Sequence, residues 1–524
     1  MSSKIYYVIL LHAHMPYINH PDSNYLEENW YFENIAESYI PLLRMIERLS
    51  SDGINPNLTI SLSPTLCHMM ENEVIERKLK KYIELRLKLI EKERESYGSN
   101  WQIKNLLDIY EERYLNCLDF INKYSGDLIT PFKLYQNQGL CEIITTPATY
   151  PIIPLIINDE TMNAQISIAS LDYKDRFSRD LAGIFLSECA YDERVDSVLE
   201  KNSINYFFVD SNAIDLSKYD PYQSYLADND ISFFVRDDVS VADVLDINGY
   251  ISNPLYREFY RDIGYERDIS YLKEFTLTEE RIPTGIKYHR ITSINKPLGE
   301  KEIYDYDLAI KQSEADAYDF LIKRINQFKS VNKDVVVVSC FNAEIFGHRW
   351  FEGINFLENI FRKTRSERFP IQFITPSNYL LTTENKIKVR PELSSSSENG
   401  FFDKWLNEKN DFIYPFLYEI TRKFIKTVNK FLNSEVSGDV DKALRQLTRE
   451  ILLMQSSDWA AMINMGDHKE YAIYRIKKHY ENSIELINML NSLSIDMDRV
   501  KKLERENGIF PFIDWRVFSS KSSF

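Results

Sequence analysis

Short apolar runs alternate with longer, helix-periodic segments through the first two thirds of the chain. Seven runs have this character: KIYYVILL (4–11), NLTISLS (57–63), CEIITTP (141–147), AGIFLSE (182–188), INYFFVD (204–210), DVVVVSC (334–340) and FPIQFITP (369–376). Several are almost continuously apolar, as strands buried on both faces should be. Because strands that alternate with helices pair in parallel, the pattern predicts an α/β fold built on a parallel sheet or barrel.

The composition changes along the chain and indicates two main parts. We expect a catalytic-type barrel over 1–390, with a charged helical excursion at about 70–135. An insertion or lid at about 190–240 is expected from its many Asp, Ser and Asn residues. PELSSSSENG, at 391–400, has the composition of a linker. Residues 401–492 are helix-periodic with few strand signals, which predicts a C-terminal helical domain over 401–524.

Charge, hydropathy and cysteine usage exclude several kinds of partner. The formal net charge is −16, and because acidic proteins repel phosphate backbones, we expect no nucleic-acid partner. No apolar stretch approaches the roughly 20 residues that span a bilayer, so we expect no membrane partner. The first apolar run is too short for a signal peptide. The five cysteines form no CxxC pair, which favours a reducing, cytoplasmic location. Oligomeric state is not determined by these features.

Aromatic residues are abundant, with 34 Tyr, 30 Phe and 6 Trp. Aromatic faces stack on the apolar faces of sugar rings, so this content is compatible with a saccharide ligand. The same residues fill ordinary hydrophobic cores, and their number alone does not separate the two uses.

Polar side chains follow three of the predicted strands, at the end where a parallel barrel has its active site. They are His12 and His14 after the first run, Glu188 and Tyr191 after the fourth, and Asn342, Glu344 and His348 after the sixth. His12 and His14 form an HxH pair, but no further ligand motif accompanies them, so no metal site is predicted. A metal-dependent hydrolase that uses these histidines and a carboxylate stays open as an alternative.

Five ordered motifs carry a family resemblance. They are LHAHMPYINHP with LEENWYFENIAESYIPLL, CEIITTPATYPIIP, FLSECAY, FNAEIFGHRWFEG and MQSSDWAAMINMGDHKEYAIYRIKKH. NPLYREFYRDIGY, TGIKYHRIT and FPFIDWRVF add to them. Over residues 4–518 the chain resembles glycoside hydrolase family 57, in particular its 1,4-α-glucan branching enzymes.

The resemblance implies a fold and a reaction. The fold would be a (β/α)7 distorted TIM-like barrel with a helical insertion and a C-terminal α-helical domain. The reaction would be retaining transfer on α-1,4-glucan without a cofactor, through two carboxyl groups about 5–5.5 Å apart. Glu188 matches the nucleophile. Asn342 stands at the acid/base position, where the family has Asp, and an amide cannot deliver the proton that a glucan leaving group needs.

Other positions also depart from the family pattern. The second motif ends in Tyr150 instead of His, and Ser187 replaces the usual Pro before the nucleophile. Ser211 and Asn212 stand where a His is frequent, the SSWG segment reads SSSS at 394–397, and Phe412 replaces a frequent Trp. An engineered Asp-to-Asn substitution would explain Asn342 but not the rest. We therefore expect natural drift of the active site.

Many residues that the resemblance assigns to saccharide binding are nevertheless present. We expect the substrate-binding set to be His12, His14, Trp30, Tyr150, Tyr191, Arg236, Glu344, His348, Trp350, Trp405, Asp458 and Trp459. The prediction is an α-glucan or related saccharide as partner, with catalysis lost or very slow, as in a saccharide-binding pseudoenzyme. An active branching enzyme, glucanotransferase or amylase is the alternative, including an engineered acid/base mutant of one.

Overall fold

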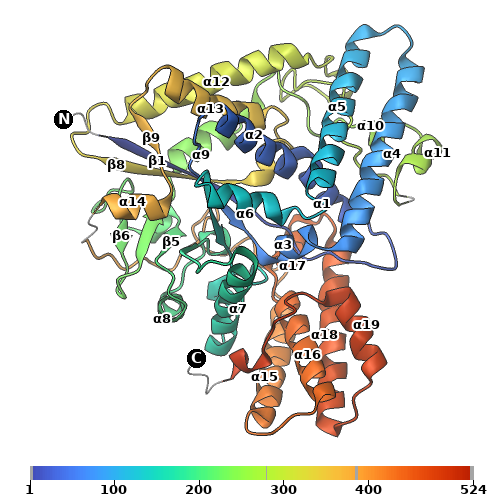
Figure 1. Cartoon of the computed structure of the whole chain (residues 1–524), viewed down its shortest axis with the longest axis vertical. Coiled ribbons are helices and arrows are strands. Elements are labelled where there is room, and N and C mark those ends of the chain that lie inside the picture. The colour runs from blue at the N-terminus through green and yellow to red at the C-terminus, as the bar shows by residue number, and fades with distance from the viewer. Residues whose placement is uncertain (1–3, 279, 384–386, 520–524) are drawn as a thin grey trace.

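A twisted sheet of mainly parallel strands forms the centre of the molecule (Figure 1). The computed structural model describes residues 4–278, 280–383 and 387–519. The strands are β1 (Ile5–Ala13), β2 (Leu58–Leu62), β3 (Cys141–Thr145), β4 (Gly183–Ile184), β5 (Tyr206–Val209), β6 (Tyr225–Leu226), β7 (Ser232–Val235), β8 (Val335–Asn342) and β9 (Ile371–Phe373). Their order is β6-β7-β5-β4-β3-β2-β1-β8, with β9 paired to the start of β1.

The sheet curls so that its two ends approach each other. Just after β7, the Asp237 N–H donates to the Val338 carbonyl of β8 at 2.8 Å. This curvature gives the distorted (β/α)7 barrel that the sequence predicts. β1 has all nine residues buried because it lies inside the sheet and is covered on both faces.

All seven apolar runs coincide with strands, but the insertion or lid expected at about 190–240 is wrong in its central part. That stretch supplies β5 and β7, which pair in parallel inside the sheet, and the antiparallel edge strand β6. The four-residue β7 was not predicted from the sequence because its apolar run is short and lies between Asp-rich segments.

Helices cover the barrel and extend it at one side. The barrel helices are α1 (Glu28–Asn34), a π-helical turn η1 (Ile35–Tyr39), α2 (Ile40–Ser51), α3 (Pro64–Met70), α6 (Ile129–Asn137), α7 (Asp159–Phe177), α8 (Asp196–Lys201), α9 (Asp238–Leu245), α10 (Ile263–Glu266), α11 (Ile269–Leu272), α12 (Tyr306–Gln327), α13 (Gly353–Ser366) and α14 (Pro376–Thr382). Two long helices, α4 (Glu73–Tyr97) and α5 (Trp101–Lys123), pack as a projecting hairpin (Figure 1). These two helices form most of the charged helical excursion that the sequence predicts at about 70–135.

The C-terminal region is a helical bundle that lies beside α7 (Figure 1). It contains α15 (Ile413–Phe431), α16 (Gly438–Met454), α17 (Ser457–Met465), α18 (Lys469–Ser492) and α19 (Met497–Asn507). The apolar face of α15 buries Ile420, Phe424 and Val428. No helix of the described residues is long and apolar enough to cross a membrane.

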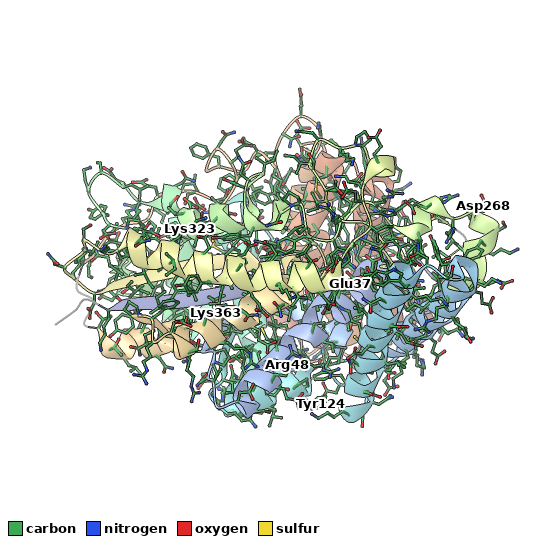
Figure 2. The ribbon with its side chains drawn as sticks, turned by 90° about the horizontal axis from the view of Figure 1, so that it is seen from above. Glu37, Arg48, Tyr124, Asp268, Lys323 and Lys363 are labelled. Carbon is green, nitrogen blue, oxygen red and sulfur yellow. The ribbon has the colours of Figure 1, made fainter. Side chains whose placement is uncertain are left out.

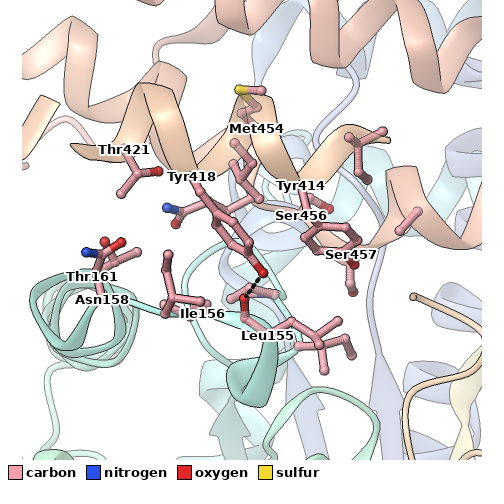
Figure 3. Close-up of a pocket in the computed structure, with 17 residues that line it drawn as sticks. Leu155, Ile156, Asn158, Thr161, Tyr414, Tyr418, Thr421, Met454, Ser456 and Ser457 are labelled. Carbon is pink, nitrogen blue, oxygen red and sulfur yellow. Dashed lines mark hydrogen bonds between the residues drawn. The ribbon is translucent and has the colours of Figure 1, made fainter. Parts of the chain in front are cut away.

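The bundle packs closely against the barrel. Figure 3 shows a small interface cavity, where the Tyr418 hydroxyl donates to the Leu155 carbonyl at 3.1 Å. Its volume of about 40 Å³ is too small for a sugar ring. The stretch 391–400 is not an exposed spacer, because Ser394 and Ser395 are buried and Tyr191 N–H donates to the Ser394 carbonyl at 2.9 Å. The division into domains at this stretch stays a prediction.

Candidate active site

A polar cavity of about 210 Å³ opens at the carboxyl ends of the strands. We call it the central cavity. Its lining comes from strand ends and from α17 of the bundle: His12, His14, Tyr150, Glu188, Asn342, Glu344, Lys404, Trp405, Ser457, Asp458, Ala461, Met462 and Met465. It therefore collects side chains from positions far apart in the sequence.

Strand register fixes the two residues at the base of this cavity. β1 and β8 pair in parallel, with His12 opposite Asn342. His12 is buried, whereas Asn342, the last residue of β8, is exposed. Burial, and next to it the neighbouring His14, hold the pKa of His12 well below its usual value, so its imidazole is neutral. One of its ring nitrogens, Nδ1, has no hydrogen-bond partner among the described residues.

Glu188 is held at the cavity by an unusual backbone. It lies in the short 3₁₀ turn η3 (Ser187–Cys189) after β4 with φ 57° and ψ 32°, and Cys189 follows with φ 51°. Two successive non-glycine residues in the left-handed region are strained, and such strain gathers at functional sites. The Glu188 carbonyl accepts from Ser396 N–H at 2.9 Å, and the Ser396 hydroxyl lies 3.4 Å from Glu188 Oε2. The strained turn is thus tied to the stretch 391–400.

Tyr150 occupies the space between the two histidines and Glu188. Its ring stacks on His14 with centroids 3.8 Å apart and on His12 at 5.0 Å. Its hydroxyl donates to Glu188 Oε1 and accepts from Glu188 N–H, both at 3.3 Å. Burial, with the charge of Glu188 added, raises the pKa of this phenol, so it stays protonated. A bulky neutral phenol therefore fills part of the space in front of Glu188.

Glu344 is the carboxyl group nearest in sequence to Asn342. It lies in the 3₁₀ turn η9 (Ala343–Ile345), and its Oε1 accepts from the Tyr39 hydroxyl and from His14 N–H, the latter at 3.3 Å. Burial raises the pKa of Glu344 above its usual value, against the lowering effect of the Tyr39 hydrogen bond. Glu344 therefore retains its proton to higher pH than an ordinary glutamate.

Asp458 lies on the opposite, bundle side of the cavity. His14 Nε2 lies 2.9 Å from Asp458 Oδ2, and the Ser456 hydroxyl donates to the same oxygen. Burial alone would raise the pKa of Asp458, but the charge and hydrogen bond of His14 outweigh it and lower that pKa. Asp458 is therefore ionised and paired.

The donor set does not favour a metal centre. Among the described residues no group of three or more His, Cys, Asp or Glu side chains is placed to hold a metal ion. His14 is engaged with Asp458, and His12 stacks on Tyr150 and on Phe185, with centroids 4.6 Å apart in the second pair. The geometry gives no support to the alternative of a metal-dependent hydrolase.

His348 does not line the central cavity. It borders a separate cavity of about 130 Å³, which we call the side cavity, lined by Glu33, Glu37, Phe259, Tyr260, Asp262, Tyr265, Pro283, Gly285, Lys287 and His348. His348 Nδ1 lies 3.0 Å from Glu37 Oε2, and Glu37 is also paired with Arg257 at 3.4 Å. The expected substrate contact of His348 is not seen at the central cavity.

Five other predicted binding residues also lie away from the central cavity. Trp30 packs edge-on against His468, Tyr191 stacks on Phe207 and bonds to Asp196, and Arg236 is paired with Asp238 and Asp210. Trp350 and Trp459 are each 1% exposed. Their aromatic rings pack within the protein interior, so the structure gives them packing roles rather than direct contact in this cavity.

Eight of the predicted catalytic and binding residues line the central cavity: His12, His14, Tyr150, Glu188, Asn342, Glu344, Trp405 and Asp458. Their roles stay predictions. Sequence reasoning missed Tyr39, Ser396 and Lys404. Tyr39 belongs to a helix rather than a strand end, and Ser396 lies in the expected linker. Among these three, only Ser396 belongs to a segment that the sequence marked, the SSSS departure at 394–397; its contact with Glu188 is seen only in the structure.

The carboxylate of Glu188 and the amide of Asn342 lie in the lining of the same cavity. Glu188 has no ion-pair partner among the described residues and reaches the cavity. Asn342 can donate and accept hydrogen bonds but cannot transfer a proton near neutral pH. The residue at the end of β8 in this cavity is therefore an amide rather than a carboxylic acid.

Comparisons with known proteins agree with this geometry. The model of glycosyl hydrolase family 57 matches residues 8–392, and that of the C-terminal region of 1,4-alpha-glucan branching enzyme matches residues 416–518. A 1,4-alpha-glucan branching enzyme of Thermococcus kodakarensis is 27% identical, covering 97% of this chain and 78% of the relative.

Two solved structures are similar over the whole chain. The alpha-amylase AmyC from Thermotoga maritima has a TM-score of 0.91 at 35% identity, covering 100% of both chains. A branching enzyme from Pyrococcus horikoshii has a TM-score of 0.88 at 26% identity, covering 100% of this chain and 98% of that one.

Proposed function

Because the chain belongs to glycosyl hydrolase family 57, we propose that its central cavity binds an α-1,4-glucan or a related saccharide, while proton-dependent glycosyl transfer is lost or strongly slowed. The observation that carries this proposal is the lining of one cavity by Glu188 and by the amide of Asn342. Positioned acid–base catalysis contributes roughly 10²–10⁴ in rate, and a glucan alkoxide leaves poorly without it.

Tyr150 should reduce the rate of glycosyl transfer further. Its ring stacks on His14 and on His12, and its hydroxyl bonds to Glu188. A smaller imidazole at this position would leave more room for a sugar beside the nucleophile. Saccharide contacts remain available from Trp405, from the neutral His12 and from Asn342 itself. Binding can therefore persist where turnover is impaired.

An active α-glucan enzyme is the second candidate, and Glu344 is the observation that favours it. Its carboxyl lines the same cavity and its pKa is raised by burial, as a proton donor requires. The relatives include both an alpha-amylase and branching enzymes. If turnover remains, hydrolysis and branching are both compatible with this family.

The test compares the wild type, Asn342→Asp and Glu188→Gln on amylose. Reducing ends and debranched chain lengths report hydrolysis and branching, and calorimetric titration with maltoheptaose reports binding. We expect binding by the wild type, turnover no higher than that of Glu188→Gln, and a gain in Asn342→Asp.

Each other result has a distinct meaning. Wild-type turnover clearly above the Glu188→Gln background would refute the loss of catalysis, and Glu344→Gln would then show whether Glu344 is the donor. Absence of maltoheptaose binding would refute the saccharide site. We retain a cytoplasmic location as part of the proposal, supported by five cysteines that are all free and buried.

A further inference from the structure

The central cavity keeps a nucleophile, has no acid at Asn342, and contains an unpaired cation. Lys404 lines the cavity, and its Nζ lies 5.2 Å from the centre of the Trp405 ring. No carboxylate oxygen of the described residues lies within 4.0 Å of its Nζ, although its charge, after that of His14, helps to lower the pKa of Asp458 in the same lining. In a chain with net charge −16, a lysine without a close carboxylate contact in the same lining as the candidate nucleophile points to an anionic group on the ligand.

We propose that the glycosyl donor of this site is a sugar 1-phosphate, an α-glycosyl phosphate whose leaving group carries its own proton. The inference rests on the proposed function, because it uses Glu188 as the nucleophile of a saccharide site. It goes further by naming a class of donor that a retaining site without an acid at position 342 can still use.

The chemistry balances without a protein acid. The Glu188 carboxylate attacks the anomeric carbon of the glycosyl phosphate monoanion, the C1–O bond breaks, and HPO₄²⁻ leaves with the proton that the phosphate already carried. A glycosyl ester of Glu188 forms. In the return step HPO₄²⁻ attacks the anomeric carbon, the ester bond breaks, and the Glu188 carboxylate and the glycosyl phosphate monoanion are regenerated. Two inversions give overall retention.

The charges around the cavity repel a phosphate group less with Asn at position 342 than they would with the Asp of the family pattern. Burial favours the protonated form of Glu344, and the charge of Asp458 is paired with His14. Asn342 is uncharged, so Glu188 is the carboxylate whose charge has no local partner in this lining. An Asp at position 342 would place a further negative charge where phosphate must lie.

Hydrogen-bond donors are also available for phosphate oxygens. Asn342 supplies an amide N–H₂ at the end of β8, and Lys404 supplies an ammonium group. His12 is neutral, is 4% exposed, and has an unpartnered Nδ1 in the same lining. An amide, an imidazole and an ammonium can together replace part of the hydration of a phosphate group.

The test is exchange of radiolabelled inorganic phosphate into the α-1-phosphates of glucose and maltotriose. We expect label to enter at least one ester with the wild type and not with Glu188→Gln. Asn342→Asp should lower exchange by about tenfold or more through charge repulsion, while it raises turnover of amylose. Exchange should decline as pH rises above about 6, because the reactive phosphate monoanion is lost there.

Lys404→Met tests the cation, and Lys409→Met is its matched control because Lys409 is exposed and does not line the cavity. Lys404→Met should raise the phosphate concentration needed for half-maximal exchange, and Lys409→Met should not. No wild-type exchange above Glu188→Gln with either ester, or higher exchange in Asn342→Asp, would overturn the proposal. Maltoheptaose binding measured on the same wild-type sample shows whether the saccharide site fails as well.

Discussion

The central and side cavities both have carboxyl groups that bond to residues of, or belong to, the π-helical turn η1, but these carboxyl groups have different partners. In the side cavity, Glu37 is paired with both Arg257 and His348. In the central cavity, Tyr39 from the same turn donates to Glu344, while Glu188 has no cation partner. Figure 2 shows Glu37 among the packed side chains, with Arg48 further along the same helical run. The π-helical insertion is a known feature of functional sites.

In the side cavity the charged groups pair with one another and stabilise the fold. In the central cavity polar groups remain free to contact a ligand. The partners of Glu37 overcome the cost of its burial and lower its pKa to about 2, whereas burial and the nearby Glu37 raise the pKa of Glu33 to about 8. The side cavity thus balances its charges internally. The central cavity leaves Glu188, Asn342 and Lys404 available, as a binding site must.

The largest expected effect comes from restoring the family pattern in the central cavity. Asn342→Asp combined with Tyr150→His should raise amylose turnover by roughly 10²–10⁴, because an acid returns and space opens beside Glu188. Initial rates of reducing-end release measure it. The same double variant carrying Glu188→Gln is the control and should be inactive. A gain of less than about tenfold would mean that the site has drifted beyond these two positions.

Removing a charge from the side cavity should affect stability instead. Glu37→Gln leaves Arg257, whose side chain is 1% exposed, without its carboxylate partner, and loss of one member of a buried pair costs about 3–5 kcal/mol. Thermal unfolding should show a large fall in Tm. Glu188→Gln is the matched change in the central cavity and should leave Tm nearly unchanged. Equal falls in both variants would remove the distinction between the two cavities.

Glu33 and Glu37, two carboxyl groups of the side cavity, should also make the stability of the protein depend on pH. The folded pKa of Glu37 is lowered to about 2, so its contribution is present above the unfolded pKa and is lost as pH falls toward 2. The folded pKa of Glu33 is raised to about 8, so stability declines as pH rises from the unfolded value toward 8. Glu33→Gln should remove that decline. Tm profiles from pH 5 to about 8 that stay parallel in the wild type and variant would contradict this.

The smallest effect concerns Ser187, which precedes the strained Glu188. Its side chain is fully buried, and its hydroxyl has no hydrogen-bond partner among the described residues. Because an unsatisfied buried polar group is unfavourable, Ser187→Ala should raise stability by up to about 1 kcal/mol. The expected result is a slightly higher Tm than that of the wild type. Ser203→Ala, at an exposed serine, is the control. A lower Tm would indicate a hidden partner for the Ser187 hydroxyl.

The strands and the general site were predictable because both depend on local patterns. Near-continuous apolar runs located β1 to β5, β8 and β9. Polar residues at or just after the ends of the first, fourth and sixth runs identified His12, Glu188 and Asn342. The short β7 was missed because four residues between Asp-rich segments give a weak pattern. The lid expected at 190–240 was wrong for the same reason.

Contacts across long sequence separations could not be predicted. His348 follows the same strand as Asn342, yet the turn after β8 directs it to Glu37 and the side cavity. Trp350 and Trp459 carry motif positions but are buried by packing. Tyr39 reaches Glu344 across 305 positions, and Ser396 reaches Glu188 across 208. No periodicity or spacing encodes such pairings.

The sequence alone determined the parallel-sheet architecture, the family resemblance and the amide at position 342, since these depend on local hydrophobic period and residue identity. The tertiary structure decided which of the predicted residues share one cavity, which carboxyls are paired, and that Tyr150 lies against Glu188. The physical reason is that burial and charge pairing depend on distances between strands and helices, and those distances exist only after the barrel and the bundle have packed together.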